Sequence, residues 1–386
     1  MEKIKVFHVV TLLELGGAQQ NTLFTVSHLN RDKFEVGLIC GLGGYLDEEA
    51  KKIPQLKVYF VNELVRPIHP LNDFIALIKI YKILKKEGPQ IVHTHSSKAG
   101  IVGRIAAWLL GVPCIIHSIH GFGFNPFQKI WTRKLFIFLE KWIGKFTERL
   151  IAVTKENIQE GLSLGIGKAE QYTLIRSGVD IKKIKKEAEN SNPELLRKEL
   201  GISPQSKIIL NVAPFKIQKD PVTFIKMAGL VLQNIPQVQF LMVGDGELRT
   251  NIEKEIKKQD IEKNIQLLGW RRDIPQILQI SDLFVLTSLW EGLPRAAVEA
   301  LIVGNPVIAF AVDGLKEIIK NNQNGFLIPP SQVNEMAEKI VQILQDQSLL
   351  QSLKKNASQT IDDSFDIYNM VIKQEELYQK LTRITQ

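Results

Sequence analysis

The segment KVFHVVTLLELGGAQQNTL, residues 5–23, contains the unit from which the whole fold can be predicted. It begins with a short run of apolar and β-branched residues, KVFHVV, which is typical of a buried strand. Gly16 and Gly17 then allow a tight turn before a helical pattern begins. A strand that leads through a glycine turn into a helix is the repeating unit of a parallel sheet covered by helices.

The same alternation continues along the chain. Five more strand-like runs follow in the first half, at VGLIC, KVYFV, QIVHTH, CIIHSIH and RLIAVT. The second half repeats the plan with KIILNVA, VQFLMVG, IQLLGW, LFVLTS, PVIAFA and GFLIPP. This pattern predicts an α/β protein with two Rossmann-like, doubly wound domains facing across a cleft, and with ligands at the carboxyl ends of the strands.

Length and composition also favour two domains. The 386 residues exceed the usual range of one hydrophobic core. We expect an N-terminal domain at 1–180, a charged linker region at 181–206, a C-terminal domain at 207–365, and a helix at 366–386 that packs back toward the N-terminal domain. Cys40 and Cys114 form no disulfide framework, so we expect a cytoplasmic protein. The first residues predict a strand rather than a signal peptide, and no apolar run reaches the ~20 residues that span a bilayer.

Glycines follow two of the predicted strands. Gly16 and Gly17 would let the first amides of the next helix bind an anion, although a plain turn has the same sequence. Gly244, in VGDGEL, stands at another strand exit. Each pattern is weak evidence by itself.

Four histidines gather near strand ends. His93 and His95 stand two residues apart in QIVHTH, and His117 and His120 lie in CIIHSIH. We expect no metal there, because no Asp, Glu or Cys stands beside them. The sequence favours a hydrogen-bonding role for His120 at the edge of the cleft and structural roles for the other three.

Basic residues follow the strands of the second half. Lys219 falls where a helix begins, a position that disfavours a cation unless an anion is bound there. Arg271 and Arg272 stand on a loop before another helix. These positions indicate an anionic ligand for the C-terminal domain.

The segment SLWEGLPRAAVEAL, residues 288–301, contains two carboxylates. Glu299 lies among apolar residues, where a carboxylate needs a partner. If Pro294 begins the helix, Glu299 is ~8 Å further along its axis than Glu291, so the two cannot share a proton. They would instead hold hydroxyls at two places along an extended ligand such as a nucleotide sugar, with a phosphate at the helix N-terminus. The alternative is that both pair with Arg295 or Arg272.

Together these segments resemble the retaining glycosyltransferase family 4. The resemblance covers nearly the whole chain and rests on GGAQ, HTHSSKAGIVGRIAAWLLGVP, HGFGF, NVAPFKIQKDP, VGDGEL, LLGWRRDIP and EGLPRAAVEAL. It implies the GT-B architecture and the retaining transfer of a sugar from a nucleotide-diphosphate sugar to an acceptor hydroxyl, in cell-surface polysaccharide or glycolipid synthesis. Two alternatives are a sugar-nucleotide epimerase of the same architecture and an inactive nucleotide-sugar-binding subunit.

The resemblance also implies roles for residues. His120 and Glu291 would lie beside the transferred sugar, and Lys219 would neutralise the donor diphosphate. The donor-binding set would be Gly16, Gly17, Lys216, Gly244, Arg271, Arg272, Ile274, Gly292, Leu293 and Glu299, the last on the ribose. Pro214 stands near where the family usually has an arginine, so Lys216 is the expected substitute. No Asp-x-Asp motif is present, so we expect a UDP- or GDP-linked donor and no metal.

Residues 121–150 suggest where the acceptor is met. They carry six Lys or Arg against two Glu, and Trp131 and Phe138 belong to an aromatic set at helical spacing beside Lys134. This pattern suits a helix on an anionic membrane surface, close to a lipid-linked or saccharide acceptor, on the cytoplasmic face. The alternative is an ordinary helix with its aromatic face in the core. No nucleic-acid-binding motif accompanies the positive charge, so we expect no nucleic-acid partner.

Overall fold

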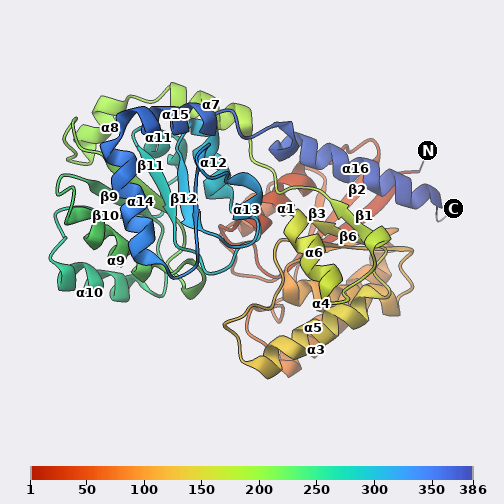
Figure 1. Cartoon of the computed structure of the whole chain (residues 1–386). Helices are drawn as coiled ribbons and strands as arrows, with labels where there is room; N and C mark the ends of the chain where they lie inside the picture. The colour runs from red at the N-terminus through yellow and green to blue at the C-terminus, as the bar shows by residue number, and fades with distance from the viewer. Residues whose placement is uncertain (1, 385–386) are drawn as a thin grey trace. The chain divides into compact units, whose positions relative to one another are not determined.

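The computed structural model describes residues 2–384, which form two compact units (Figure 1). The first unit comprises the chain up to Gly178 and the segment from Ile367 onward, and the second is Val179–Asp366. Each is built on a parallel sheet with helices between its strands. The predicted class, α/β with two doubly wound domains, is confirmed.

The first unit contains a seven-stranded parallel sheet in the order β3-β2-β1-β4-β5-β6-β7. Its strands are β1 (Ile4–Val10), β2 (Phe34–Cys40), β3 (Leu56–Phe60), β4 (Ile91–His95), β5 (Cys114–Ile119), β6 (Arg149–Ala152) and β7 (Tyr172–Leu174). Its helices are α1 (Gly17–His28), α2 (Asp47–Lys51), α3 (Pro70–Glu87), α4 (Ser97–Leu109), α5 (Ile130–Gly144), α6 (Lys155–Ser163), the 3₁₀ turn η1 (Ala169–Gln171) and α16 (Ile367–Ile384). Only β7 was not predicted, because three partly buried residues make a weak sequence signal.

The second unit contains a six-stranded parallel sheet in the order β10-β9-β8-β11-β12-β13. Its strands are β8 (Ile208–Val212), β9 (Gln239–Val243), β10 (Ile265–Gly269), β11 (Leu283–Leu286), β12 (Val307–Phe310) and β13 (Gly325–Ile328). Its α-helices are α7 (Ile181–Glu189), α8 (Pro193–Glu199), α9 (Pro221–Leu232), α10 (Arg249–Gln259), α11 (Ile274–Gln279), α12 (Arg295–Val303), α13 (Leu315–Ile318), α14 (Val333–Gln345) and α15 (Gln347–Ala357). Two 3₁₀ turns are η2 (Ile217–Lys219) and η3 (Asp363–Phe365).

The segment 181–206, expected to be a linker, is instead part of the second unit. It forms α7 and α8, and α7 contacts α11 and α12. Ile184 and Ala188 are buried, so the charged residues of α7 cover only its outer face. Arg197 of α8 donates to the carbonyls of Ser203 and Ile280, which fixes α8 on the unit.

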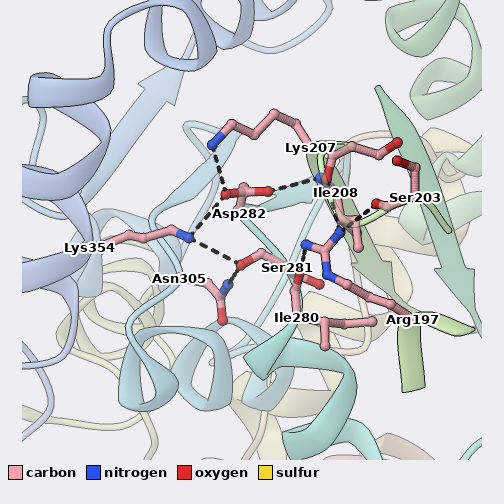
Figure 2. A network of polar contacts seen from close by, with 10 residues as sticks. Arg197, Ser203, Lys207, Ile208, Ile280, Ser281, Asp282, Asn305 and Lys354 are labelled. Carbon is pink, nitrogen blue, oxygen red and sulfur yellow. Dashed lines mark hydrogen bonds and ion pairs between the residues drawn. The ribbon is translucent and has the colours of Figure 1, made fainter. Parts of the chain in front are cut away.

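A polar network joins this region to the sheet (Figure 2). Asp282, at the start of β11, accepts hydrogen bonds from the backbone N–H of Ile208 at 3.0 Å and from the ammonium groups of Lys207 and Lys354 at 3.4 and 3.2 Å. The Asp282 side chain is 11% exposed, so these partners offset the cost of burying its charge. The network ties β8, β11 and α15 together.

The C-terminal helix α16 belongs to the first unit and contacts α1. Met370, Val371, Tyr378 and Leu381 lie in the same buried cluster as residues of β1 and β2. The chain therefore returns to complete the first unit after the second has been built.

Candidate functional site

The second sheet has a topological switch point between β8 and β11, where the strand order reverses. Ligands of doubly wound sheets bind outside the carboxyl ends of the strands at such a point. Lys219 follows β8, and Glu291 follows β11. The two residues that the resemblance marks as catalytic in the C-terminal domain therefore lie on neighbouring loops.

Lys219 and Glu291 contact each other directly. The Lys219 ammonium donates to Glu291 Oε1, and the Glu291 backbone N–H donates to Asp313 Oδ2 at 2.6 Å. Burial raises the pKa of the Asp313 carboxyl, and the hydrogen bond from Glu291 opposes that rise. A cation and two carboxylates thus gather within one small group at the switch point.

Hydrogen bonds to backbone carbonyls join the loop after β8 to the loop after β11. The Thr287 hydroxyl donates to the carbonyls of Lys219 and Asp220, at 3.1 and 2.9 Å, and the Leu289 N–H donates to the Gln218 carbonyl at 2.8 Å. Asp220 has a positive φ of 43° and caps α9 by accepting from the Thr223 N–H. Lys219 is therefore fixed beside the start of α9, as expected.

Glu299 lies on α12, one turn after Arg295, and pairs with it at 3.3 Å. Burial raises the pKa of Glu299 above its ordinary value, and the Arg295 guanidinium opposes the rise. In the unliganded protein Glu299 is therefore paired with Arg295, as the alternative interpretation of the sequence expected. One long ion pair still leaves carboxylate lone pairs able to accept from hydroxyl groups.

The loop after β8 explains the glycine at 244. Gly244 has a φ of 137°, and a Cβ there would come within 2.0 Å of the Ala213 carbonyl oxygen. Phe215 is fully buried, and its N–H donates to the Asp245 carbonyl. The residues that replace the family's usual arginine are thus built into the unit, and Lys216 is the N-cap residue of the η2 turn directly after them.

Arg271 is engaged within its own loop. Its guanidinium pairs with both oxygens of Asp273, at 2.8 and 2.5 Å, which lowers the pKa of that carboxyl. Arg272 next to it is exposed, and Ile274 begins α11. In the loop before α12, Gly292 is partly buried and Leu293 is buried.

In the first unit, Gly16 is the N-cap residue of α1, and Gly17 is its first residue. No side chain caps this helix, so its first amides remain available to an anion. A Cβ on Gly16 would meet Gln19 Oε1 at 2.3 Å.

His120 follows β5 and is partly buried. Its ring nitrogens face His95 Nδ1 and Ser177 Oγ, each at 3.4 Å. Burial lowers the pKa of His120 to about 4, so the ring is neutral at neutral pH. Beside it, a cavity of about 10 Å³ is also lined by Ser118 and Asn21.

Sequence reasoning missed His8. The pairing of β1 with β4 places His8 opposite His93, and its Nδ1 lies 2.9 Å from His95 Nε2. Ring nitrogens of His8, His93 and His95 lie within 4.8 Å of one another. The signal was a polar residue in the apolar run KVFHVV. His117 lies apart from this group and bonds to Thr94.

Helix α5 presents its aromatic residues to the outside. Trp131 and Phe138 are 64% and 65% exposed, so the core-helix alternative for this face is wrong. The opposite face is anchored by Glu140, which pairs at 2.7 Å with the fully buried Arg104 of α4. Across residues 2–384, no helix has the length and apolar character needed to cross a bilayer.

Known proteins resemble this one along its whole length. The family models described as "Glycosyltransferase Family 4" and "Glycosyl transferases group 1" match residues 15–183 and 192–360. The UDP-Gal:alpha-D-GlcNAc-diphosphoundecaprenol alpha-1,3-galactosyltransferase of Escherichia coli is 36% identical over 383 residues, which are 97% of each protein. The chain belongs to glycosyltransferase family 4. Its class, a retaining glycosyltransferase, is the one expected from the sequence.

A further relative agrees with this family, and a solved structure shares the fold. The N,N'-diacetylbacillosaminyl-diphospho-undecaprenol alpha-1,3-N-acetylgalactosaminyltransferase of Campylobacter jejuni is 27% identical over 75% of this chain and 77% of that protein. The crystal structure of Anabaena Alr3699/HepE in complex with UDP and glucose matches with a TM-score of 0.82 at 22% identity, over 97% of this chain and 99% of that one. This last likeness concerns the fold, which is GT-B.

Proposed function

We propose that this glycosyltransferase moves a hexose from a UDP-linked sugar to a hydroxyl of a saccharide carried on a lipid diphosphate, in cell-surface polysaccharide or glycolipid synthesis. The observation that carries the proposal is the 36% identity over 97% of both chains with an enzyme named for UDP-Gal and a diphosphoundecaprenol-linked acceptor. The Campylobacter relative is also named for a diphospho-undecaprenol substrate.

The donor would bind at the switch point of the second sheet. In the unliganded protein the Lys219 ammonium is held by Glu291. A diphosphate attracts that ammonium more strongly than a single carboxylate does, so donor binding would move Lys219 onto the phosphate. Glu291 is then released to accept from a sugar hydroxyl, while Glu299 accepts from the ribose.

The transfer itself needs stabilisation of the leaving group. The bond from the anomeric carbon to the diphosphate breaks as the bond to the acceptor oxygen forms on the same face. The acceptor proton passes to the leaving phosphate oxygen. Negative charge grows on the diphosphate along this path, and Lys219 and the N-termini of α9 and α12 are aimed at it.

These groups supply positive charge without a metal ion, and the sequence has no Asp-x-Asp motif. We therefore extend the proposal to metal-independent transfer. Activity in excess EDTA would support it, and a strict requirement for Mg²⁺ or Mn²⁺ would contradict it.

The acceptor side would lie at the cytoplasmic face of a membrane. Lys134 and Lys141 of α5, and Lys145 directly after it, are exposed at the same three- and four-residue spacing as Trp131 and Phe138. Aromatic and basic side chains therefore share one face, as in helices that lie in an anionic interface. The protein would attach there peripherally, where a lipid-linked acceptor is found.

The experiment is a transfer assay with a GlcNAc-diphospholipid acceptor. UDP-galactose, UDP-glucose, UDP-GalNAc and GDP-mannose are compared, and the anomeric configuration of the product is read by NMR. We expect an α-linked product from a UDP-hexose. Transfer only from GDP-mannose, a β-linked product, or no transfer from any of the four donors would contradict the proposal.

A further inference from the structure

A single hydrogen-bonded network runs through the buried histidines of the first unit. We call it the histidine network, and it joins, in order, Ser118, His93, Tyr378, His8, His95, His120 and Ser177. Each of the eight ring nitrogens has one partner in it. His120, which follows β5, is the last ring before Ser177.

The rings of this network are neutral. Burial lowers the pKa of His8 to about 3 and that of His120 to about 4, and it lowers those of His93 and His95 well below 6.5. A neutral imidazole has one N–H donor and one acceptor nitrogen. Rings bonded in series must therefore all donate in the same direction, so one fixed end sets every tautomer.

The backbone of Gly178 provides that fixed end. The Asn21 amide satisfies its neighbours when its NH₂ group donates to the Gly178 carbonyl at 2.9 Å and its oxygen accepts from the Gly178 N–H and the Ser177 hydroxyl, each at 3.2 Å. Backbone N–H and C=O groups cannot exchange roles. In this orientation the Asn21 oxygen takes the Ser177 proton, so Ser177 Oγ accepts from His120 Nδ1–H at 3.4 Å; the Gly178 N–H also donates to Met370 Sδ at 3.4 Å.

The direction in which each N–H donates then follows from ring to ring. His120 Nε2 accepts from His95 Nδ1–H at 3.4 Å, and His95 Nε2 accepts from His8 Nδ1–H at 2.9 Å. The Tyr378 hydroxyl donates to His8 Nε2 at 3.5 Å. Gln374 Oε1, 3.3 Å from the same hydroxyl, shares that proton. This sharing affects only the end of the network remote from His120.

We propose that the histidine network is a positioning device, in which Asn21 and Ser177 hold His120 as its Nδ1–H tautomer. The Nε2 atom of His120 then carries the lone pair. Its contact with His95 is 3.4 Å, as long as the contact between Nδ1 and Ser177 Oγ, but Asn21 holds Ser177 in place, so an incoming hydroxyl replaces the His95 contact. Resting on the proposed function, the network makes His120 an acceptor for a substrate hydroxyl, with Asn21, Ser177 and His95 as positioning residues.

Tautomers can be read without any activity. The full-length protein is labelled with ¹⁵N-histidine, and NMR at pH 7.5 separates protonated from unprotonated ring nitrogens, with His120 assigned from the spectrum of His120→Gln. We expect wild-type His120 to be protonated at Nδ1. Ser177→Ala and Asn21→Leu should give a mixture of both tautomers, and Ser177→Thr, which keeps the hydroxyl, should restore the single one.

Kinetics and a matched control complete the test. Ser177→Ala should lower kcat/KM about 10-fold, the worth of about one hydrogen bond, with recovery in Ser177→Thr. Tyr172→Phe removes a different hydroxyl of the same unit, one that donates to the Ile166 carbonyl, and should leave the His120 tautomer unchanged.

Several results would overturn the inference. They are a wild-type His120 protonated at Nε2, a tautomer that stays single in both Ser177→Ala and Asn21→Leu, or one equivalent of tightly bound zinc in the isolated protein with His8, His93 and His95 as its ligands. Because the wild-type spectrum alone reports the tautomer, a variant that fails to fold does not decide the matter. A correct tautomer in a protein without transfer activity would refute the proposed function and leave the positioning role intact.

Discussion

Lys219 and Glu291 form an ion pair between the loops that follow β8 and β11, the strands at which the order of the second sheet reverses. Only 15% of the Lys219 side chain and 5% of the Glu291 side chain are exposed. A carboxylate buried to this extent needs its cation, and the same cation is the proposed partner of the donor diphosphate. The pair therefore couples the stability of the second unit to its chemistry.

Replacing Lys219 by Met should affect both properties. Turnover should fall ~100-fold or more while donor affinity falls less, because the leaving-group charge grows along the reaction. The free energy of unfolding of the apo protein should fall by about 3 kcal/mol, since Glu291 loses its partner, and Glu291→Gln in the same protein should recover part of it. Lys226→Met, on the exposed face of α9, is the control. Equal effects on turnover and donor affinity would instead indicate that Lys219 stabilises the bound donor and the transition state to the same extent.

Glu299→Gln should weaken UDP binding about 10-fold and leave the fold intact. The carboxylate's main partner would be the ribose, with the 3.3 Å contact to Arg295 as a minor one. Calorimetric titration with UDP, beside a thermal melt of the apo protein, measures both quantities. Glu253→Gln, in an exposed pair with Arg249, is the matched control. A lower melting temperature with unchanged affinity would show that Glu299 serves the fold alone.

The same substitution has a defined pH dependence. Since the pKa of Glu299 is raised on folding, the folded protein binds this proton more tightly than the unfolded chain does. The stability that the proton contributes is present at low pH and is lost as the pH rises through the folded-state pKa. Relative to Glu299→Gln, the wild type should therefore be most stable at acid pH. Melting curves from pH 4 to 8 test this, and an opposite slope would refute it.

The buried histidines should make the first unit sensitive to acid. Their pKa values are lowered on folding, so the stability that they contribute is full above the unfolded value of 6.5 and is lost as the pH falls toward the folded values of about 4 for His120 and about 3 for His8. Each should lose ~1.4 kcal/mol per pH unit in this range. In denaturant titrations between pH 6 and 4, the free energy of unfolding of His8→Gln should fall less steeply with decreasing pH than that of the wild type, by about 1.4 kcal/mol per pH unit. The same change at exposed His28 should not, and an unaltered slope in His8→Gln would contradict the assignment.

Reversing Lys134, Lys141 and Lys145 to Glu should abolish most binding to anionic vesicles at low salt. Each basic residue near such a surface contributes ~1 kcal/mol, and salt should weaken the wild type in the same way because it screens charges beyond ~10 Å at 0.1 M. Co-sedimentation with neutral and anionic vesicles is the measurement.

The vesicle experiment has a matched control in the second unit. Lys254, Lys257 and Lys258 are exposed on α10, and reversing them changes the net charge equally. Circular dichroism checks that both triple variants fold, and turnover of a soluble acceptor should survive in both. If the α5 and α10 variants sediment alike, the face of α5 is not the attachment site.

The features that were predicted correctly from the sequence are those that local residue patterns determine. Strand runs such as KVFHVV, and the positions of Lys219 and Glu291 after their strands, follow from hydrophobic periodicity and loop residues. The contact between Lys219 and Glu291 was not predicted, because it depends on β8 and β11 being neighbours although β9 and β10 separate them in sequence. His8 was missed for the same reason, since only the register of β1 with β4 brings it to His93.

The linker prediction failed for a different physical reason. The segment 181–206 has few large apolar residues, but Ile184 and Ala188 fall on one face of α7 and are enough to bury it against its neighbours. The high proportion of charged residues in this segment reflects the exposed face of α7. It does not reveal the narrow apolar face on the other side, which packs against the unit.

Helix α16 has a consequence for how the protein is made. The strands of the first unit are translated before the second unit, yet their core is completed by Met370, Val371 and Tyr378, which are translated after it. The continuous second unit, Val179–Asp366, can finish folding while the first is still waiting for its final helix. A nascent chain of this protein therefore keeps apolar side chains of the first unit uncovered until the second unit has been translated, and a product that stops before Ile367 would expose apolar surface in its first unit rather than in its second.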